Sequence, residues 1–273
     1  RQATSQISYE VIVTDNGSTD GTIEMLQTEF PEVKLIRLHI NRGYTLPMNL
    51  ALRSGTGDYL MQLNPDTVIH QDLLENLLAF IDVYPEAGIC TPKVLNQDGT
   101  LQKQCRRSAA RPLDVVSYFT GLAAVFPKSE VFGRYLMTFL PENEICEVEA
   151  VSGSCMLIRR EVVDQIGYLD EAFFAYQEDS DYCFRAREAG WEIYYVPTAT
   201  LVHLGGRGGS MHNYERGIKE WHRSYELYYD KHLAKDYSPF VNKLMHWGMK
   251  MKYSLSLAVN ALRRDKVVGT PKP

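Results

Sequence analysis

The first 95 residues alternate between short apolar runs and amphipathic segments, and this alternation limits the folds open to the chain. The apolar runs read "VIVT", "VKLIRLH", "DYLMQL" and "AGICTPKVL". Between them lie segments whose apolar residues recur at helical spacing, such as "TIEMLQTEF" and "QDLLENLLAFIDVYPEAG". Strands that alternate with helices at this interval are typical of βαβ units and a mainly parallel sheet. The sequence therefore predicts an α/β fold.

Two polar turns, "TDNGSTDG" and "NPDT", follow predicted strands. In open α/β sheets ligands bind beyond the carboxyl ends of the strands, so both turns should face one crevice. Asp15 could accept a hydrogen bond from a nucleotide base or a ribose hydroxyl. Asp66 could hold a divalent cation that bridges two phosphates, and its hard oxygen ligands suit Mg²⁺ or Mn²⁺. Helix caps and turns use the same residue types, so a purely structural interpretation stays open for both.

An acidic cluster begins the predicted helix "QEDSDYCFRAREAGW" with Glu178, Asp179 and Asp181. The helix dipole favours carboxylates at this end, so capping alone could explain them. Glu178 and Asp179 are adjacent, so their side chains diverge and one could point at a substrate while the other caps. A general base for a sugar hydroxyl must lie within hydrogen-bond reach of it. Asp181 is interpreted as a helix-start carboxylate.

A lone histidine, His203, ends the strand-like run "YYVPTATLV" and precedes the loop "GGRGGS". A single histidine at a strand end is more often structural than a metal ligand, and both interpretations stay open. The loop could close over a ligand, and Arg207 could meet phosphate oxygens. The loop matches neither a P-loop nor a GxGxxG motif.

The overall composition is that of a soluble globular protein, with 45% hydrophobic and 23% charged residues. A net charge of −5 argues against a nucleic-acid partner. The 5 cysteines form no CxxC pair, which indicates reduced thiols in the cytoplasm. No apolar run approaches the roughly 18 to 20 residues of a membrane span, and no signal peptide is recognisable. Residue 1 is Arg and not Met, which is consistent with numbering that begins inside a longer chain.

The segment from Asn242 onward mixes basic residues with Leu, Met, Trp and Val. A basic amphipathic helix can lie on an anionic membrane surface, which makes this segment a candidate for peripheral contact with the inner face of the membrane. A C-terminal helix docked on its own domain explains the same pattern equally well.

The order of these motifs resembles that of the family 2 glycosyltransferases with the GT-A fold, especially their rhamnosyltransferase-like branch. The resemblance rests on "VIVTDNGSTDGT", "NRGYTLPMNLALRSGTGDYLMQLNPDT", "VSGSCMLIRREVVDQIGYLDEAFFAYQEDSDYCFRAREAGW" and "VPTATLVHLGG". These pieces cover most of residues 9 to 206. The implied fold is Rossmann-like, with a mainly parallel sheet flanked by helices and a helical C-terminal extension.

The resemblance also implies roles for individual residues. Asp179 would be the catalytic base, with Glu178 as the alternative, and Asp66 and His203 would bind Mg²⁺ or Mn²⁺. Asn64 stands where a strict DxD motif has its first acid. The remaining implied contacts are to the donor, from Asp15, Asn16, Ser18, Asn41, Gly43, Asn49, Asn64 and Arg207, and to the acceptor, from Ser152, Gly153, Ser154 and Tyr176.

The implied activity is inverting transfer of a sugar, with rhamnose as one candidate, in the synthesis of a cell-surface polysaccharide. The donor would be a UDP- or dTDP-sugar, and the acceptor would be a hydroxyl of a glycan or of a lipid-linked glycan. A non-catalytic relative that binds nucleotide sugars or glycans is the alternative. A sugar nucleotidyltransferase is disfavoured because the chain lacks a GxGxRL-type opening. The sequence gives no oligomeric state.

One departure concerns the start of the domain. Family members normally begin with a strand and a helix before the strand that corresponds to "VIVTDNGS", whereas only about ten residues precede it here. The chain is therefore expected to lack this unit, which normally forms one wall of the base pocket. The predicted division is a donor-binding half over 1–110, an acceptor-binding and catalytic half over 111–230, and a helical tail over 231–273.

Overall fold

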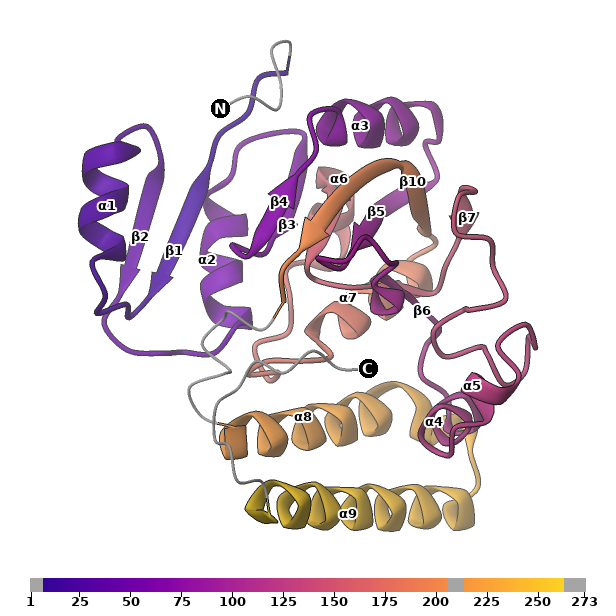
Figure 1. The fold of residues 1–273 in the computed structure, drawn as a ribbon. Helices are drawn as coiled ribbons and strands as arrows, with labels where there is room; N and C mark the ends of the chain where they lie inside the picture. Colours follow the sequence, from indigo (N-terminus) through magenta and orange to yellow (C-terminus); the bar gives the residue numbers. More distant parts are fainter. Residues whose placement is uncertain (1–6, 206–213, 263–273) are drawn as a thin grey trace.

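The first strand–helix–strand unit forms a small lobe beside the rest of the protein (Figure 1). The structure is a computed structural model, and it describes residues 7–205 and 214–262. Strands β1 (Ile12–Asn16) and β2 (Lys34–Leu38) pair in parallel, and α1 (Thr22–Glu29) connects them. Helix α2 (Thr45–Ser54) then leads from this lobe to the larger sheet.

Six strands form the larger sheet, in the order β3, β9, β5, β10, β4, with β7 paired to β10. Strand β9 is antiparallel to both β3 and β5, whereas β5 and β10 are parallel. The strands β3, β5 and β10 therefore share one direction, which agrees with the predicted α/β class and mainly parallel arrangement. Their bounds are β3 Tyr59–Leu63, β4 Thr67–Ile69, β5 Ala87–Leu95, β7 Cys146–Glu147, β9 Cys155–Arg159 and β10 Glu192–His203.

Helices cover this sheet and bury its apolar side chains. Helix α3 turns Leu77 and Ile81 toward the sheet, where they meet fully buried side chains such as Ile89 and Ile158. A further pair of short strands, β6 and β8, runs antiparallel beside helix α7. The bounds are α3 Leu73–Val83, α4 Pro112–Phe119, α5 Leu122–Val125, α6 Arg160–Ile166, α7 Glu178–Glu188, β6 Arg106–Arg107 and β8 Ala150–Val151.

The two sheets face each other across a gap. Strand β1 pairs with β2 alone and β3 pairs with β9 alone, so within residues 7–205 and 214–262 no strand lies between β1 and β3. Apolar side chains of both strands, including Val13 and Met61, line the hollow between them.

The C-terminal helices pack as a pair against the part of the domain that carries α4 and α7. Helix α8 (Tyr214–Tyr228) continues through a π-helical turn (Tyr229–Leu233) and a short 3-10 turn to α9 (Pro239–Leu262). The hydroxyls of Tyr225 and Tyr228 donate to the carbonyls of Ala110 and Ala109. Helix α9 lies outermost, with α8 between it and the sheet (Figure 1). The boundaries at 110 and 230 stay predictions.

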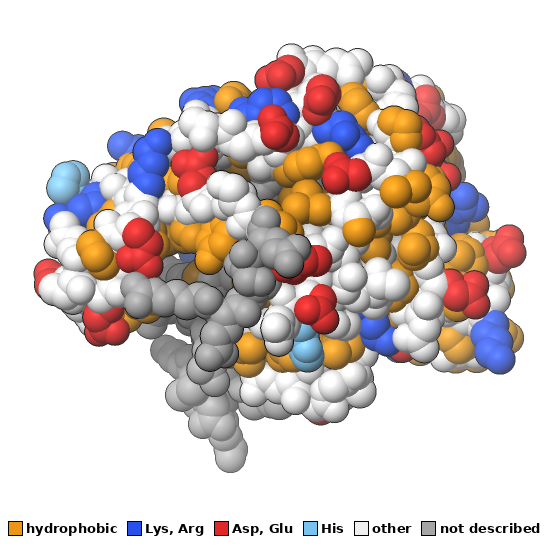
Figure 2. Space-filling model, turned by 90° about the horizontal axis from the view of Figure 1, so that it is seen from above, with side chains coloured by type: hydrophobic (Ala, Val, Ile, Leu, Met, Phe, Trp, Pro, Cys, Tyr) orange, Lys and Arg blue, Asp and Glu red, His pale blue; other side chains and the backbone are white. Residues whose placement is uncertain are grey.

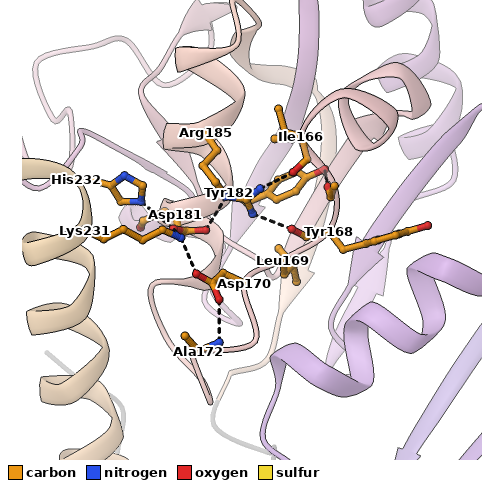
Figure 3. Close-up of polar contacts among 12 residues, drawn as sticks. Ile166, Tyr168, Leu169, Asp170, Ala172, Asp181, Tyr182, Arg185, Lys231 and His232 are labelled. Atoms are coloured by element: carbon orange, nitrogen blue, oxygen red, sulfur yellow. Dashed lines mark hydrogen bonds and ion pairs between the residues drawn. The ribbon is translucent and has the colours of Figure 1, made fainter.

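A buried aspartate joins this helical pair to α7. Asp181 is fully buried and accepts hydrogen bonds from His232 Nε2 at 2.7 Å, Lys231 Nζ at 2.6 Å and Arg185 Nε at 2.9 Å (Figure 3). Burial opposes its charge, but the hydrogen bonds from His232 and Lys231 and the charge of Arg185 outweigh burial and lower the pKa of Asp181 to about 2. Asp181 is thus more than the helix-start carboxylate expected from the sequence.

The same cations hold the loop that leads into α7. Arg185 donates to the carbonyls of Ile166 and Tyr168 at 2.8 Å each, and Lys231 forms an ion pair with Asp170 at 2.6 Å (Figure 3). Because charged hydrogen bonds fix geometry well, the loop and the first turn of α7 have one defined position. The catalytic half is therefore tied to the turn that precedes α9.

We expect Asp181→Asn to lower the free energy of unfolding by about 3 to 5 kcal/mol, because it removes the fully buried carboxylate that Lys231, His232 and Arg185 share. Urea denaturation measures this loss. Asp230→Asn is the matched control, since Asp230 forms an ion pair with His246 nearby but its side chain is 49% exposed. Such an exposed pair contributes about 1 kcal/mol or less. Equal effects of the two substitutions would contradict a central role for Asp181.

Candidate active site

A long hollow brings most of the predicted site residues together. Its volume of about 3390 Å³ exceeds the roughly 300 to 1,000 Å³ of a single small-molecule pocket, so it is a groove that also takes in the gap between β1 and β3. The predicted site residues that line it are Asn16, Asn41, Gly43, Asn64, Asp66, Ser152, Gly153, Ser154, Tyr176, Glu178, Asp179 and His203.

The predicted donor residues of the first turn hold the small lobe in shape. The Asn16 amide donates to the Gly43 carbonyl at 2.6 Å, and its Oδ1 accepts from the Arg42 N–H at 2.8 Å. Asp15 is buried, and its carboxylate accepts from the N–H groups of Gly17 and Ser18 at 3.1 Å. Asp15 therefore organises the turn, and donor contacts from Asp15 and Ser18 stay predictions.

Gly43 marks a close approach between the small lobe and the loop before α7. Its φ is +90°, and a Cβ there would lie 2.2 Å from the Phe174 carbonyl oxygen. The N–H of Tyr44 donates to that same carbonyl at 2.7 Å. The loop then passes through Tyr176 and Gln177, whose φ values of +67° and +62° are uncommon for residues with a side chain. Such strain persists where surrounding structure imposes it, which is frequent at functional sites.

Tyr44 links the two halves of the groove. Its hydroxyl lies 2.8 Å from Asn64 Oδ1 and 3.1 Å from the Gly153 carbonyl, and it accepts a hydrogen bond from Gln62 at 3.0 Å. Burial, and then the negative charge of Glu178, raise the pKa of Tyr44 well above its usual value. The phenol therefore stays protonated and acts as a donor between the "NPDT" turn and the "SGS" turn.

Asp66 and His203 meet at the edge of the larger sheet, where β4 and β10 run antiparallel. His203 Nε2 lies 3.1 Å from Asp66 Oδ1 and 3.4 Å from Asn64 Nδ2. On the other side of the ring, Nδ1 lies 2.8 Å from Gln102 Oε1. An amide oxygen only accepts, so Nδ1 carries a proton and donates it to Gln102, while Nε2 faces the Asp66 carboxylate.

This pair fits a divalent cation. A carboxylate oxygen and an imidazole nitrogen lie side by side here, as two ligands of one metal ion can, and a ligand histidine usually donates its other N–H to an acceptor as His203 does to Gln102. Within residues 7–205 and 214–262 no cluster of three or more His, Cys, Asp or Glu could hold a metal. Mg²⁺ and Mn²⁺ suit such a sparse site, because water and phosphate oxygens complete their coordination.

Asp179 is ion-paired at the start of α7. Its Oδ2 lies 2.7 Å from Arg107 Nη2 and accepts the Gly153 N–H at 2.9 Å. Its Oδ1 accepts the Ser180 N–H at 2.7 Å. Burial disfavours the charge on Arg107, but the Asp179 carboxylate outweighs it and raises the pKa of this guanidinium above its ordinary value. The pair therefore holds Asp179 as an oriented carboxylate beside the "SGS" turn.

Glu178 has a different environment. It is buried, and its Oε2 has no hydrogen-bond partner among the residues that the structure describes. Burial and the neighbouring Asp179 charge raise the pKa of Glu178 to about 8. At neutral pH the two adjacent carboxyls thus differ, with Asp179 ion-paired and Glu178 mostly protonated. Their side chains diverge as the sequence predicted, whereas the assignment of the base to Asp179 stays a prediction.

Two predicted donor residues remain, Asn49 and Arg207. Asn49 is fully buried, donates to the Leu169 carbonyl and Glu171, and accepts the Leu169 N–H. Both ends of its amide are therefore engaged in holding the loop before α7, in contrast to the predicted donor contact. Arg207 lies outside the residues that the structure describes.

Sequence reasoning missed Tyr44, Gln102 and Arg107. Tyr44 lies in "NRGYTLP" and Arg107 in "CRRSAARP". The adjacent arginines of the second stretch are a signal for a carboxylate partner, but the partner lies 72 positions further along the chain and the sequence does not identify it. Gln102 carries no such signal, because its role depends on the pairing of β10 with its neighbours.

Comparison with known proteins agrees with this site. The family model described as "Glycosyl transferase family 2" matches residues 1–167. The chain belongs to glycosyl transferase family 2. It is also 30% identical, over 94% of its length and 85% of the relative's, to the N-acetylglucosaminyl-diphospho-decaprenol L-rhamnosyltransferase of Mycobacterium tuberculosis. This family 2 glycosyltransferase is therefore rhamnosyltransferase-like, as the motif order indicated.

Other relatives are more distant. The low-salt glycan biosynthesis hexosyltransferase Agl10 of Haloferax volcanii is 24% identical over 94% of this chain and 78% of its own length. The mannosyltransferase PcManGT from Pyrobaculum calidifontis, solved with GDP-Man and Mn²⁺, has a TM-score of 0.52 at 17% identity, over 94% of this chain and 67% of its own. S. aureus TarS 1-349 with UDP-GlcNAc has a TM-score of 0.53 at 16% identity, over 80% of this chain and 56% of its own. These structures confirm the GT-A fold.

Two further observations concern the surface and the helices. None of the described helices is long and apolar enough to cross a bilayer. On the face seen from above, basic and acidic side chains are interspersed (Figure 2). The predicted absence of a nucleic-acid partner stays a prediction.

Glu178 makes stability depend on pH. Its folded pKa of about 8 lies above the ordinary value of 4.5, so the favourable contribution of the protonated carboxyl is complete below pH 4.5 and is lost as pH rises through 8. We expect Glu178→Gln, which cannot ionise, to stabilise the protein at pH 9 by on the order of 3 kcal/mol and to have little effect at pH 5.

Urea denaturation at the two pH values measures this difference. Glu188→Gln is the matched control, because Glu188 is the exposed last residue of the same helix. A Glu178→Gln effect that is equal at pH 5 and pH 9 would contradict the buried, protonated state of Glu178.

Proposed function

We propose that the protein is an inverting, metal-dependent glycosyltransferase that moves a sugar from a nucleotide-diphosphate donor to a hydroxyl of a glycan or lipid-linked glycan. One observation carries the proposal, namely that two pairs of charged side chains lie in one connected site. Asp66 with His203, and Asp179 with Arg107, line the same groove. Hydrogen bonds through Asn64, Tyr44 and Gly153 link the two pairs. A phosphate-holding cation and a base for a hydroxyl are the two groups that this transfer needs.

The chain's own residues account for the proposed steps. The acceptor hydroxyl gives its proton to Asp179 while its oxygen attacks the anomeric carbon, and the bond from that carbon to the diphosphate breaks with the electron pair leaving on the diphosphate. Asp66 and His203 would hold Mg²⁺ or Mn²⁺, which when bound stabilises negative charge on the diphosphate. Arg107 forms an ion pair with Asp179 and fixes its direction, and Gly153 donates its N–H to the same oxygen.

The remaining residues of the groove have supporting roles in this proposal. Asn16, Asn41 and Gly43 shape the wall beside the donor, and Ser152, Ser154 and Tyr176 border the acceptor. Tyr44, kept protonated, donates a hydrogen bond between the two regions.

The name of the mycobacterial relative supports a choice of substrates. We propose dTDP-rhamnose as the first donor to test, with UDP-sugars next, and a lipid diphosphate that carries N-acetylglucosamine as the acceptor. We propose that the protein works in the cytoplasm at the inner face of the membrane, where such acceptors are presented, and that its product enters a cell-wall polysaccharide.

The alternative is a non-catalytic relative that binds nucleotide sugars or glycans. The gap between β1 and β3 favours this alternative, because a wall of the base pocket would normally stand there. Release of nucleoside diphosphate from a nucleotide sugar with Mn²⁺ present distinguishes the two functions, since only an enzyme turns the donor over.

We expect Asp179→Asn to lower kcat for transfer by about 10² to 10⁴, because a positioned general base contributes about that factor. Donor affinity should change little, since Asp179 does not hold the donor in this proposal. Nucleoside diphosphate release measures turnover, and Asp164→Asn, an exposed aspartate on α6, is the control. Near-normal turnover by Asp179→Asn would refute the assignment.

The pH profile of transfer separates the two candidate bases. If Asp179 is the base, kcat/KM is level near neutral pH and falls through about pH 8, because Glu178 then ionises beside it and repels the diphosphate. If Glu178 is the base, kcat/KM rises through the same pH. The opposite signs of the two slopes decide between them.

A further inference from the structure

Helix α9 presents an exposed apolar stripe along its whole length. Its members recur at intervals of three and four residues, the spacing of one helical face. Each side chain is between 47% and 82% exposed, although large apolar residues usually find cover. The stripe consists of Phe240, Leu244, Trp247, Met251, Leu255, Val259 and Leu262.

The opposite face of α9 is already used. Met245 and Met249 pack on the aromatic cluster of α8 and the π-helical turn, and the Asn242 amide accepts from the Tyr229 hydroxyl at 2.6 Å. His246 bonds to Asp230 at 2.8 Å. The helix is therefore docked on its own domain by one face, which leaves the stripe on the outer side of the molecule (Figure 1).

The charge of α9 differs from that of the whole chain. The helix contains no aspartate or glutamate, whereas the full chain has a net charge of −5. Lys243 and Lys250 are exposed, and the helical repeat places both along one border of the stripe. Lys252 lies on the other border, with its Nζ over the rings of Trp221 and Phe119 at 4.0 and 4.5 Å. An apolar stripe bordered by lysines is complementary to anionic lipid.

We propose that α9 lies flat on the surface of a bilayer that contains anionic lipid, with the stripe among the headgroups and Lys243 and Lys250 at the phosphates. No described helix can span a bilayer, so the contact is peripheral. The proposal gives the membrane location proposed above a specific contact surface. It rests on the proposed function only for the nature of the acceptor, because vesicle binding can be measured without turnover.

A second copy of the chain is the other candidate for covering the stripe. Two such helices packed face to face would bring their lysine borders close together, and like charges at short range oppose association. Anionic lipid neutralises those borders instead. The charge pattern therefore favours the bilayer.

The test is co-sedimentation of the full chain with vesicles of phosphatidylcholine alone or mixed with phosphatidylglycerol. We expect binding to the anionic vesicles only. Lys250→Glu should weaken it about fivefold or more, since each surface lysine near an anionic bilayer contributes about that factor. The double change Leu244→Gln and Leu255→Gln should weaken it at least about tenfold.

Matched controls lie far from α9. Arg37→Glu on β2 and Val83→Gln at the end of α3, whose side chain is 72% exposed, should bind like the parent protein. Trp247 reports the contact directly: its fluorescence should shift to the blue on binding, and Trp247→Phe should remove that shift while binding is retained.

Three outcomes would overturn the proposal. The first is that the protein binds neither kind of vesicle. The second is that the control variants lose as much vesicle binding as the α9 variants. The third is that light scattering shows a dimer, which the double variant Leu244→Gln and Leu255→Gln abolishes. If an α9 variant that no longer binds vesicles still transfers sugar to a soluble acceptor, its transferase activity is intact. Failure of this proposal is therefore distinguishable from failure of the proposed function.

Discussion

The arrangement of the site depends on one buried carboxylate. Asp181 has no solvent contact and is surrounded by His232, Lys231 and Arg185, which also hold the loop before α7. A buried charge with this many partners tolerates few alternative positions, because each displacement leaves a cation unpaired. The first turn of α7 is therefore fixed, and with it the direction in which Asp179 meets Arg107. The helical pair that carries the outer stripe is attached at the same point.

The site contains two groups of charged side chains, and they differ in chemistry. In one, Gln102 orients His203 so that Nε2 faces Asp66. In the other, Arg107 forms an ion pair with Asp179, while burial keeps Glu178 protonated at neutral pH. Tyr44 lies between them as a hydrogen-bond donor. This separation of cation binding from proton transfer is what a displacement at a sugar–diphosphate bond requires.

The sequence predicted much of this from local pattern and motif order. Alternating periodicity predicted the strands and helices, and the order of "NPDT" before "VHLGG" predicted that Asp66 and His203 meet. Arg107 could not be predicted, because its contact with Asp179 joins residues 72 positions apart through the pairing of β6 with β8. Asn49 was assigned to the donor from its motif alone, whereas packing against the loop near Leu169 engages its whole amide. Asp181 was interpreted as a helix-start carboxylate because two of its partners, Lys231 and His232, come from the π-helical turn, 50 and 51 positions further along the chain.

The central claim is that cation-assisted donor binding and proton transfer reside on different carboxylates of one groove. Calorimetric titration with UDP, dTDP and GDP, with and without Mn²⁺, tests it most directly. The account predicts that at least one nucleotide binds only when Mn²⁺ is present, that Asp66→Asn abolishes this binding, and that Asp179→Asn retains it. Binding that needs no metal, or that survives Asp66→Asn unchanged, would contradict the account.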